Sequence, residues 1–136
     1  MKTSRGEQSR KRQNVLQSSR EIKTPSAQWI RKNVYTPSIR LSNPYFWNRL
    51  KKRNIDIREI DEALQSCEII EILKKHNPIR LLVNGYTFKR RPIHIVFSVW
   101  PFSIDNETSS YWLDVVTAYE PEPSRWITPT KRKGQS

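Results

Sequence analysis

His94 is the residue whose type and position best suit acid–base chemistry. It lies within the alternating run 93–99, which is typical of a half-buried strand. An imidazole with its ordinary pKa of about 6.5 can accept and donate a proton near neutral pH. His94 could therefore transfer protons during cleavage of an RNA phosphodiester. The alternative is structural: a strand histidine that is hydrogen-bonded to a neighbour.

Two arginines and two tyrosines could complete such a site. Arg49 and Arg53 are four residues apart, so a helix would place them on one face, where they could hold a phosphate and stabilise developing negative charge. Tyr45 and Tyr119 could donate hydrogen bonds from their hydroxyl groups. The arginines could equally form a solvated face paired with acidic residues of the next helix. The sequence contains no Gly-rich phosphate loop and no metal-ligand motif, so we expect no metal and no other cofactor.

Charge is distributed unevenly along the 136 residues. Residues 1–53 contain 14 basic and 2 acidic residues, a net charge of +12, whereas residues 54–136 contain 11 of each. This asymmetry predicts that the front segment binds a polyanion, with RNA or the ribosome as the expected partner; a solubilising extension is the alternative. The basic residues expected to contact nucleic acid are Arg10, Lys11, Arg12, Arg31, Lys32, Lys89, Arg90 and Arg91. The last three could instead be the exposed loop of a hairpin.

The front segment has two parts of different composition. Residues 1–28 contain few side chains able to form a core, so we expect disorder in the free protein. Residues 29–41 interleave aromatic and aliphatic side chains with cations, and Pro37 excludes one continuous helix. These residues could stack on bases or pack on the domain, and the sequence leaves both open.

The remaining chain predicts an α+β domain: two short helices packed on a curved, antiparallel sheet of about four strands. Asn43 before Pro44 starts a helix over 44–53, and a capping box at Asp56 starts a second over 57–66. Strands are expected over residues 67–73, 79–83, 93–99 and 111–119, joined as a meander.

We expect three parts along the chain. They are a basic, largely disordered arm of residues 1–40, the domain of residues 41–128 and a basic tail of residues 129–136. Trp126 should pin the C-terminal segment onto the sheet, because a tryptophan buries a large area at low entropic cost.

Composition also bears on location. Cys67 is the single cysteine, so an internal disulfide is impossible and a thiolate zinc site is excluded. No apolar run approaches the roughly 18–20 residues of a membrane span. The basic start lacks the apolar stretch of a secretory signal, although its Arg- and Ser-rich character is shared with transit peptides. We expect a cytoplasmic protein without a membrane partner.

Four stretches match, in order, the motifs of a known family. Residues 45–55 match the helix pattern H-A-x-x-R-M-x-x-R-x-I, except that Tyr45 replaces the histidine. The strand G-E-I-I-E is matched by residues 67–71 and the strand P-L-H-V-V by residues 92–96. The motif T-x-Y-E-P, followed by Trp, is matched by residues 117–121 and by Trp126. Residues 45–127 therefore resemble the bacterial domain of unknown function 4258.

The resemblance implies a relation to RelE-like and barnase-like ribonuclease toxins, and it leaves two functions open. The first is a toxin-like RNA-binding protein that acts as a metal-independent ribonuclease, with an antitoxin or another protein as partner. Its catalytic residues would be His94, Arg49, Arg53, Tyr119 and Tyr45. The second is a non-catalytic module that binds nucleic acid or a ribonucleoprotein through the arm. Its active site would be degenerate, because Tyr45 cannot replace a histidine as general base.

Overall fold

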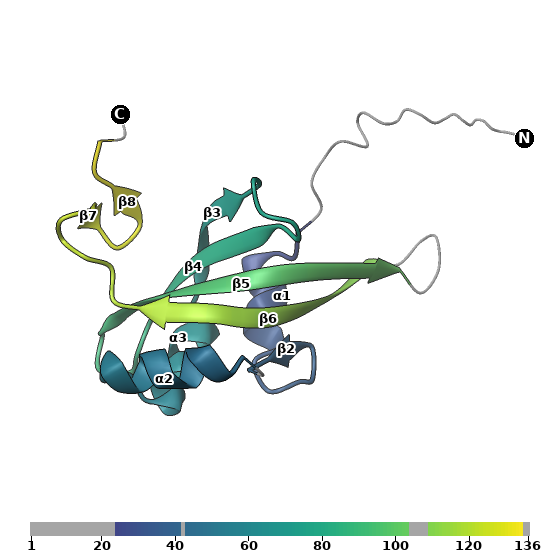
Figure 1. Cartoon of the computed structure of the whole chain (residues 1–136), viewed down its shortest axis with the longest axis horizontal. Helices are drawn as coiled ribbons and strands as arrows, with labels where there is room; N and C mark the ends of the chain where they lie inside the picture. Colours follow the sequence, from purple (N-terminus) through teal and green to yellow (C-terminus); the bar gives the residue numbers. More distant parts are fainter. Residues whose placement is uncertain (1–23, 42, 104–108, 135–136) are drawn as a thin grey trace, which may run out of the picture.

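The computed structural model describes residues 24–41, 43–103 and 109–134 (Figure 1). Its elements are, in chain order, α1 (Ala27–Lys32), β2 (Ile39–Arg40), α2 (Pro44–Lys52), α3 (Ile57–Gln65), β3 (Glu68–Leu73), β4 (Arg80–Tyr86), β5 (Pro92–Ser103), β6 (Ser109–Tyr119), β7 (Trp126–Thr128) and β8 (Lys131–Arg132). The α+β class predicted from the sequence is confirmed. None of the helices in these ranges is long and apolar enough to cross a membrane.

Five strands form the main sheet in the order β2-β6-β5-β4-β3. The four longer strands are antiparallel neighbours, as the meander predicted. The prediction of about four strands missed β2, which pairs in parallel with β6 through only two residues. Such a short strand has no periodicity to detect in the sequence, because its stability depends on the strand beside it.

Local capping signals fix where the two main helices begin. The side chain of Asn43 accepts a hydrogen bond from the backbone of Tyr45, and Pro44 occupies the first helical turn of α2. At α3, the side chain of Asp56 and that of Glu59 satisfy each other's backbone amides in a complete capping box. Both predicted helices are therefore confirmed, each one residue shorter than expected.

The three helices lie on one face of the sheet and bury the main core against it (Figure 1). The alternating residues of β5 point into this core, which contains the fully buried side chains Ile93, Ile95 and Phe97. The residues between them point to the opposite face. We call that second face the open face, because no described helix covers it.

Gly85 allows α3 to lie directly against β4. A Cβ atom at this position would come within 1.8 Å of the carbonyl oxygen of Ala63. The sequence predicted that this strand would end near Asn84 and Gly85, but β4 continues to Tyr86. Here glycine marks a close approach between a helix and a strand rather than a turn.

Residues 24–40 were assigned to the arm, but the structure places them on the domain. Ile30 in α1 and Ile39 in β2 are 0% and 9% exposed and belong to the main core. The alternative in which this segment packs on the domain is therefore correct. Residues 1–23, to which most of the expected disorder was assigned, lie outside the described residues.

Candidate functional site

Arg53 follows the last turn of α2 and reaches the outer edge of β6. Its Nη1 donates hydrogen bonds to the hydroxyl of Thr117, at 2.8 Å, and to the carbonyl oxygen of Ala118, at 2.7 Å. Its guanidinium carbon lies 5.8 Å from the ring centre of Tyr119. Since β2 pairs only with residues 113 and 114 of β6, Arg53 supplies a donor to an edge carbonyl that no described strand reaches.

His94 lies directly opposite Tyr119 in the pairing of β5 with β6, and it is 0% exposed. Its ring contacts those of Tyr119 and Trp126 edge-on, with centroid distances of 5.5 and 4.6 Å. Its Nε2 lies 2.6 Å from the carbonyl oxygen of Pro129. A carbonyl can only accept, so Nε2 carries the hydrogen of the imidazole.

Two buried polar atoms next to this contact lack a partner. Among the described residues, neither Nδ1 of His94 nor Oδ1 of Asn84, the residue opposite it on β4, has a hydrogen bond. With the hydrogen on Nε2 both atoms are acceptors, so they cannot bond to each other. Protonation of Nδ1 would supply a donor. However, burial lowers the pKa of His94, an effect that outweighs the opposing bond from the carbonyl of Pro129.

The C-terminal segment covers His94. Trp126 on β7 is 6% exposed and packs against Leu82 and Val96 on the open face. The prediction that this tryptophan pins the segment onto the sheet is confirmed. Because Pro129 and Trp126 both contact the imidazole, the same segment closes the site over His94.

Arg132 on β8 fastens this cover. It donates two hydrogen bonds to the carboxylate of Glu71 on β3, at 2.9 and 2.8 Å, and its guanidinium lies 4.5 Å from the ring centre of Trp126. The sequence predicted a separate basic tail over residues 129–136. Instead, Arg132 of this tail is tied to the sheet, because it finds both an anion and an aromatic face there.

A pocket of about 310 Å³ opens beside the covered histidine. It is lined by Arg53, Tyr119, Glu120, Glu122, Arg125, Trp126 and Arg132. Burial raises the pKa of Tyr119, so its hydroxyl stays protonated and can donate at neutral pH. His94 does not line the pocket, and a ligand there would meet arginines and a phenol but no imidazole.

The structure does not bring all five expected catalytic residues together. Arg53, His94 and Tyr119 lie at one end of the sheet, as the contacts above show. Tyr45 is 70% exposed on the first turn of α2, and Arg49 is exposed one turn before Arg53. Arg53 follows Tyr45 by eight positions, a rise of about 12 Å along a helix, so the two side chains do not share one small site.

Arg91, which was expected to contact nucleic acid, joins several elements of the domain. It forms ion pairs with Glu59 at 3.0 Å and with Glu120 at 2.7 Å, and it donates to the backbone oxygens of Asn54 and Arg53. These bonds connect the end of α2, the start of α3 and the end of β6. A phosphate could bind Arg91 only by displacing these partners.

The other expected nucleic-acid contacts lie on two separate surfaces. Lys89 and Arg90 are exposed in the turn between β4 and β5, where Arg90 lies 5.5 Å from the ring centre of Tyr86. Arg31 and Lys32 are exposed at the end of α1. The cations Arg10, Lys11 and Arg12 lie outside the described residues.

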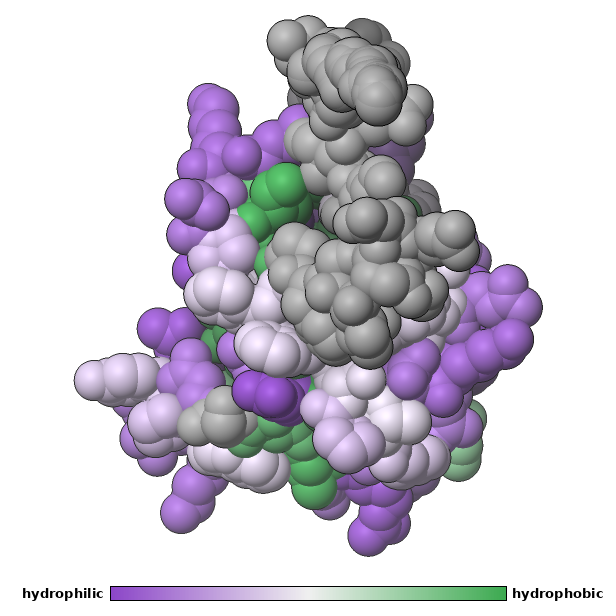
Figure 2. All heavy atoms as spheres, turned by 90° about the vertical axis from the view of Figure 1, so that its right-hand side faces the viewer, coloured by the Kyte–Doolittle hydropathy of each residue, from purple (hydrophilic) through white to green (hydrophobic). Residues whose placement is uncertain are grey.

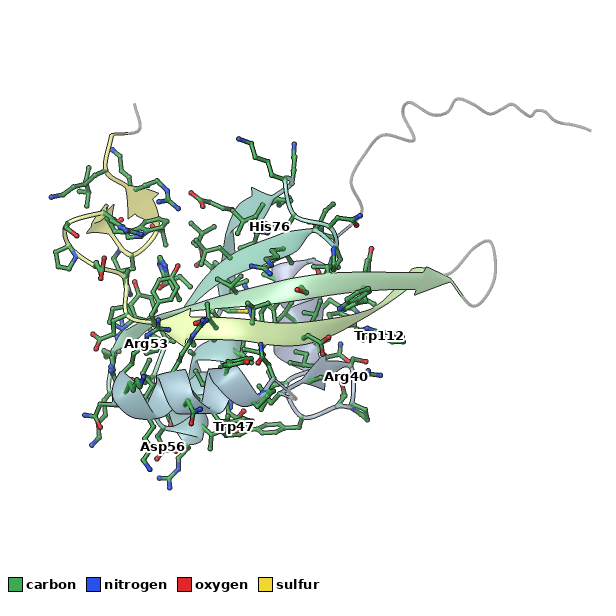
Figure 3. All side chains as sticks on the ribbon, in the orientation of Figure 1. Arg40, Trp47, Arg53, Asp56, His76 and Trp112 are labelled. Carbon is green, nitrogen blue, oxygen red and sulfur yellow. The ribbon has the colours of Figure 1, made fainter. Side chains whose placement is uncertain are left out.

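A further group, which the sequence analysis missed, lies at the other end of the open face. Figure 3 shows Arg40 and Trp112 together there, far from Arg53. The guanidinium of Arg40 lies 4.4 Å from the ring centre of Trp112, and Trp100 is the partner of Trp112 across the β5–β6 pair. These residues are distant in sequence, and only the strand register brings them together.

Comparison with known proteins assigns most of the domain to a family. A family model described as "Domain of unknown function (DUF4258)" matches residues 47–120. The match begins within α2 and ends at Glu120, so it excludes α1, β2 and the C-terminal cover. No curated protein and no solved structure matches the chain. A relation to RelE-like or barnase-like toxins stays a prediction. The chain belongs to the domain of unknown function 4258 family.

Proposed function

We propose that this protein binds RNA through its basic N-terminal part and that it does so without catalysis. The observation that carries the proposal is the charge distribution: the entire excess of +12 lies in residues 1–53. No residue between positions 22 and 55 is acidic. A polyanion is the ligand that such a segment attracts most strongly, because binding releases its condensed counterions.

The packing of the domain supports the availability of these cations. All seven basic residues between positions 24 and 53 are exposed. The ion pairs found among the described residues use arginines from the neutral part of the chain, namely Arg91, Arg125 and Arg132. The cations of α1 and α2 are therefore free to contact phosphates, apart from the bonds of Arg31 and Arg53 to backbone and hydroxyl oxygens.

The salt dependence of binding tests this proposal. The affinity of the full chain for a single-stranded RNA of about ten nucleotides should fall steeply and log-linearly with salt concentration. The double variant Lys11→Ala/Arg12→Ala should bind more weakly at low salt. The slope of log affinity against log salt should be shallower by about 1.4, because two phosphate contacts are lost and each contributes about 0.7 with a single strand.

A matched control separates the N-terminal charge from charge in general. Lys131→Ala/Lys133→Ala removes the same charge from two exposed residues of the C-terminal segment that covers His94, in the neutral part of the chain. It should leave both affinity and slope unchanged. Equal effects of the two double variants, or no binding by the natural chain at low salt, would refute the proposal.

A metal-independent, toxin-like ribonuclease is the second candidate, and one observation favours it. Arg53, His94 and Tyr119 meet at one end of the sheet. The burial of His94 under Trp126 and Pro129 argues against cleavage while these residues cover it. Incubation of labelled RNA with the full chain in EDTA decides between the two, with His94→Gln and Arg53→Gln as variants. Cleavage that both variants abolish would replace our proposal by this one.

A further inference from the structure

A row of polar side chains crosses the open face near the β5–β6 hairpin. In the strand register Arg40 of β2 lies beside Asp114 of β6, Asp114 beside Ser98 of β5, and Ser98 beside Arg80 of β4. Residues in register on neighbouring strands point to the same face. Here that is the open face, because the next residues along these strands belong to the main core. The row therefore has an arginine at each end and a carboxylate and a hydroxyl between them.

Two tryptophans lie directly next to this row. Trp100 and Trp112 face each other across β5 and β6, two residues beyond Ser98 and Asp114, so they point to the same face. Trp100 is 40% exposed, and the guanidinium of Arg40 lies 4.4 Å from the ring centre of Trp112. Seen from the hairpin end, side chains of intermediate hydropathy lie beside strongly hydrophilic ones (Figure 2). We call this group of six residues the aromatic row.

We propose that the aromatic row binds single-stranded RNA: a base of the RNA stacks on Trp100 while the arginines of the row hold the phosphates. A flat, exposed aromatic ring between cations is the arrangement that unpaired bases and their backbone require. This inference rests on the proposed RNA binding and names the surface that contacts the bases. The aromatic row would contribute a contact with the bases, whereas the basic segment contacts only the phosphates.

Charge complementarity selects RNA over other occupants of this surface. Arg40 is part of the acid-free stretch of residues 22–55, so the row is continuous with the basic segment. Asp114 is the acidic member of the row, and its Oδ1 is buried without a hydrogen bond from any described residue. A base carries N–H donors that can bond to the other oxygen of this carboxylate, whereas a purely apolar partner carries none.

The full chain carrying Trp100→Ala tests the proposal with the same RNA of about ten nucleotides. Loss of one stacked base should weaken binding about tenfold. The slope of affinity against salt should stay unchanged, because no phosphate contact is removed. Trp100→Phe, which keeps an aromatic face, should recover most of the affinity.

Phe88→Ala is the matched control. Phe88 is 71% exposed in the turn between β4 and β5, and eight residues of strand, or about 26 Å, separate that turn from Trp100. This variant should bind RNA as the natural chain does. Thermal unfolding of each variant verifies that the domain is folded.

Each outcome has a defined meaning. If the natural chain binds RNA and Lys11→Ala/Arg12→Ala weakens it, but Trp100→Ala has no effect, the aromatic row is not the base-binding surface although the proposed function stands. If Trp100→Ala changes only the oligomeric state in sedimentation, the surface serves self-association and the proposal is overturned. If the natural chain binds no RNA, both proposals fail.

Discussion

An arginine lies on a tryptophan ring at each end of the open face, and the two ends differ in what covers them. At the His94 end, Arg132 lies 4.5 Å from the ring centre of Trp126, which is 6% exposed. At the hairpin end, Arg40 lies 4.4 Å from the ring centre of Trp112. The adjacent Trp100 is 40% exposed. The first contact packs the protein's own C-terminal segment, whereas the second lies beside a ring that solvent reaches.

The comparison shows that residue type alone does not identify a binding site. The His94 end has the residue types that we expected in a catalytic site, but Trp126 and Pro129 contact the imidazole, which is fully buried. The six residues of the aromatic row include no histidine and offer exposed aromatic and cationic groups instead. The first end therefore packs the protein's own chain, RNA contact at the second is our proposal, and the following changes test this contrast.

Trp126→Ala should have the largest effect on stability. It removes a buried tryptophan from the small cluster with Leu82 and Val96, so the free energy of unfolding should fall by about 3 kcal/mol. Chemical denaturation measures this loss. Trp100→Ala is the comparison at the other end, where loss of the exposed ring should lower the free energy of unfolding by less than about 1 kcal/mol. Equal losses at the two ends would contradict the contrast between packing and binding.

His94 should make folding stability depend on pH. Burial lowers its pKa in the folded protein, so the unfolded chain binds the proton more readily. Stability is then complete above the unfolded pKa of about 6.5 and decreases as the pH falls below it, by at most about 1.4 kcal/mol per pH unit. His94→Gln should remove this contribution. The charges of Arg132 and Glu71 also act on the pKa of His94, and salt screens such effects. Denaturation curves of both proteins from pH 7.5 to about 5 should therefore be compared at constant salt.

Much of the fold could be predicted because its signals are local. Asn43 and the Asp56–Glu59 capping box fixed the helix starts, and the alternation of residues 93–99 identified the strand and its two faces. The elements that were missed, α1, β2, β7 and β8, have two to six residues each. Elements of this length gain their stability from tertiary contacts, such as those of Ile30 with the core, and these leave no periodic pattern.

The candidate sites were predicted less well, for the same reason. The family resemblance grouped His94, Arg53 and Tyr119 in one expected site, and the structure brings these three together. It could not predict that Pro129, 35 residues away, would bond to His94. Nor could it align Arg40, Arg80 and Asp114 in one row, because that requires the register of three strand pairs.

Arg132→Gln should loosen the cover of the His94 end. The side chains of this pair are 38% and 22% exposed, so we expect a loss of about 1 kcal/mol in the free energy of unfolding. Hydrogen exchange should quicken at residues 126–132 while the core strands stay protected. Arg125→Gln is the matched control, because its pair with Glu122 spans 3.6 Å and is largely exposed. Unchanged exchange in Arg132→Gln would show that Trp126 alone holds the cover.

Asp114→Asn should have the smallest effect, and it sharpens what the hairpin end recognises. Guanine presents two adjacent donors, N1–H and the N2 amino group, and the two lone pairs of the other Asp114 carboxylate oxygen can accept from both. A base stacked on Trp100 lies next to Asp114 in the register. RNA that contains guanine should therefore bind the natural chain about fivefold more tightly than the same RNA with adenine, below the gain of a fully buried bidentate pair.

In Asp114→Asn this preference should disappear, because an amide has a single acceptor oxygen and adds a competing donor. Replacing guanine with hypoxanthine removes only the N2 amino group, so it should weaken binding to the natural chain but not to the variant. Ser98→Ala, a change in the same row, should leave the preference intact. Equal affinity of the natural chain for guanine and adenine RNA would limit the proposed contact to stacking, because an aromatic ring stacks with any base.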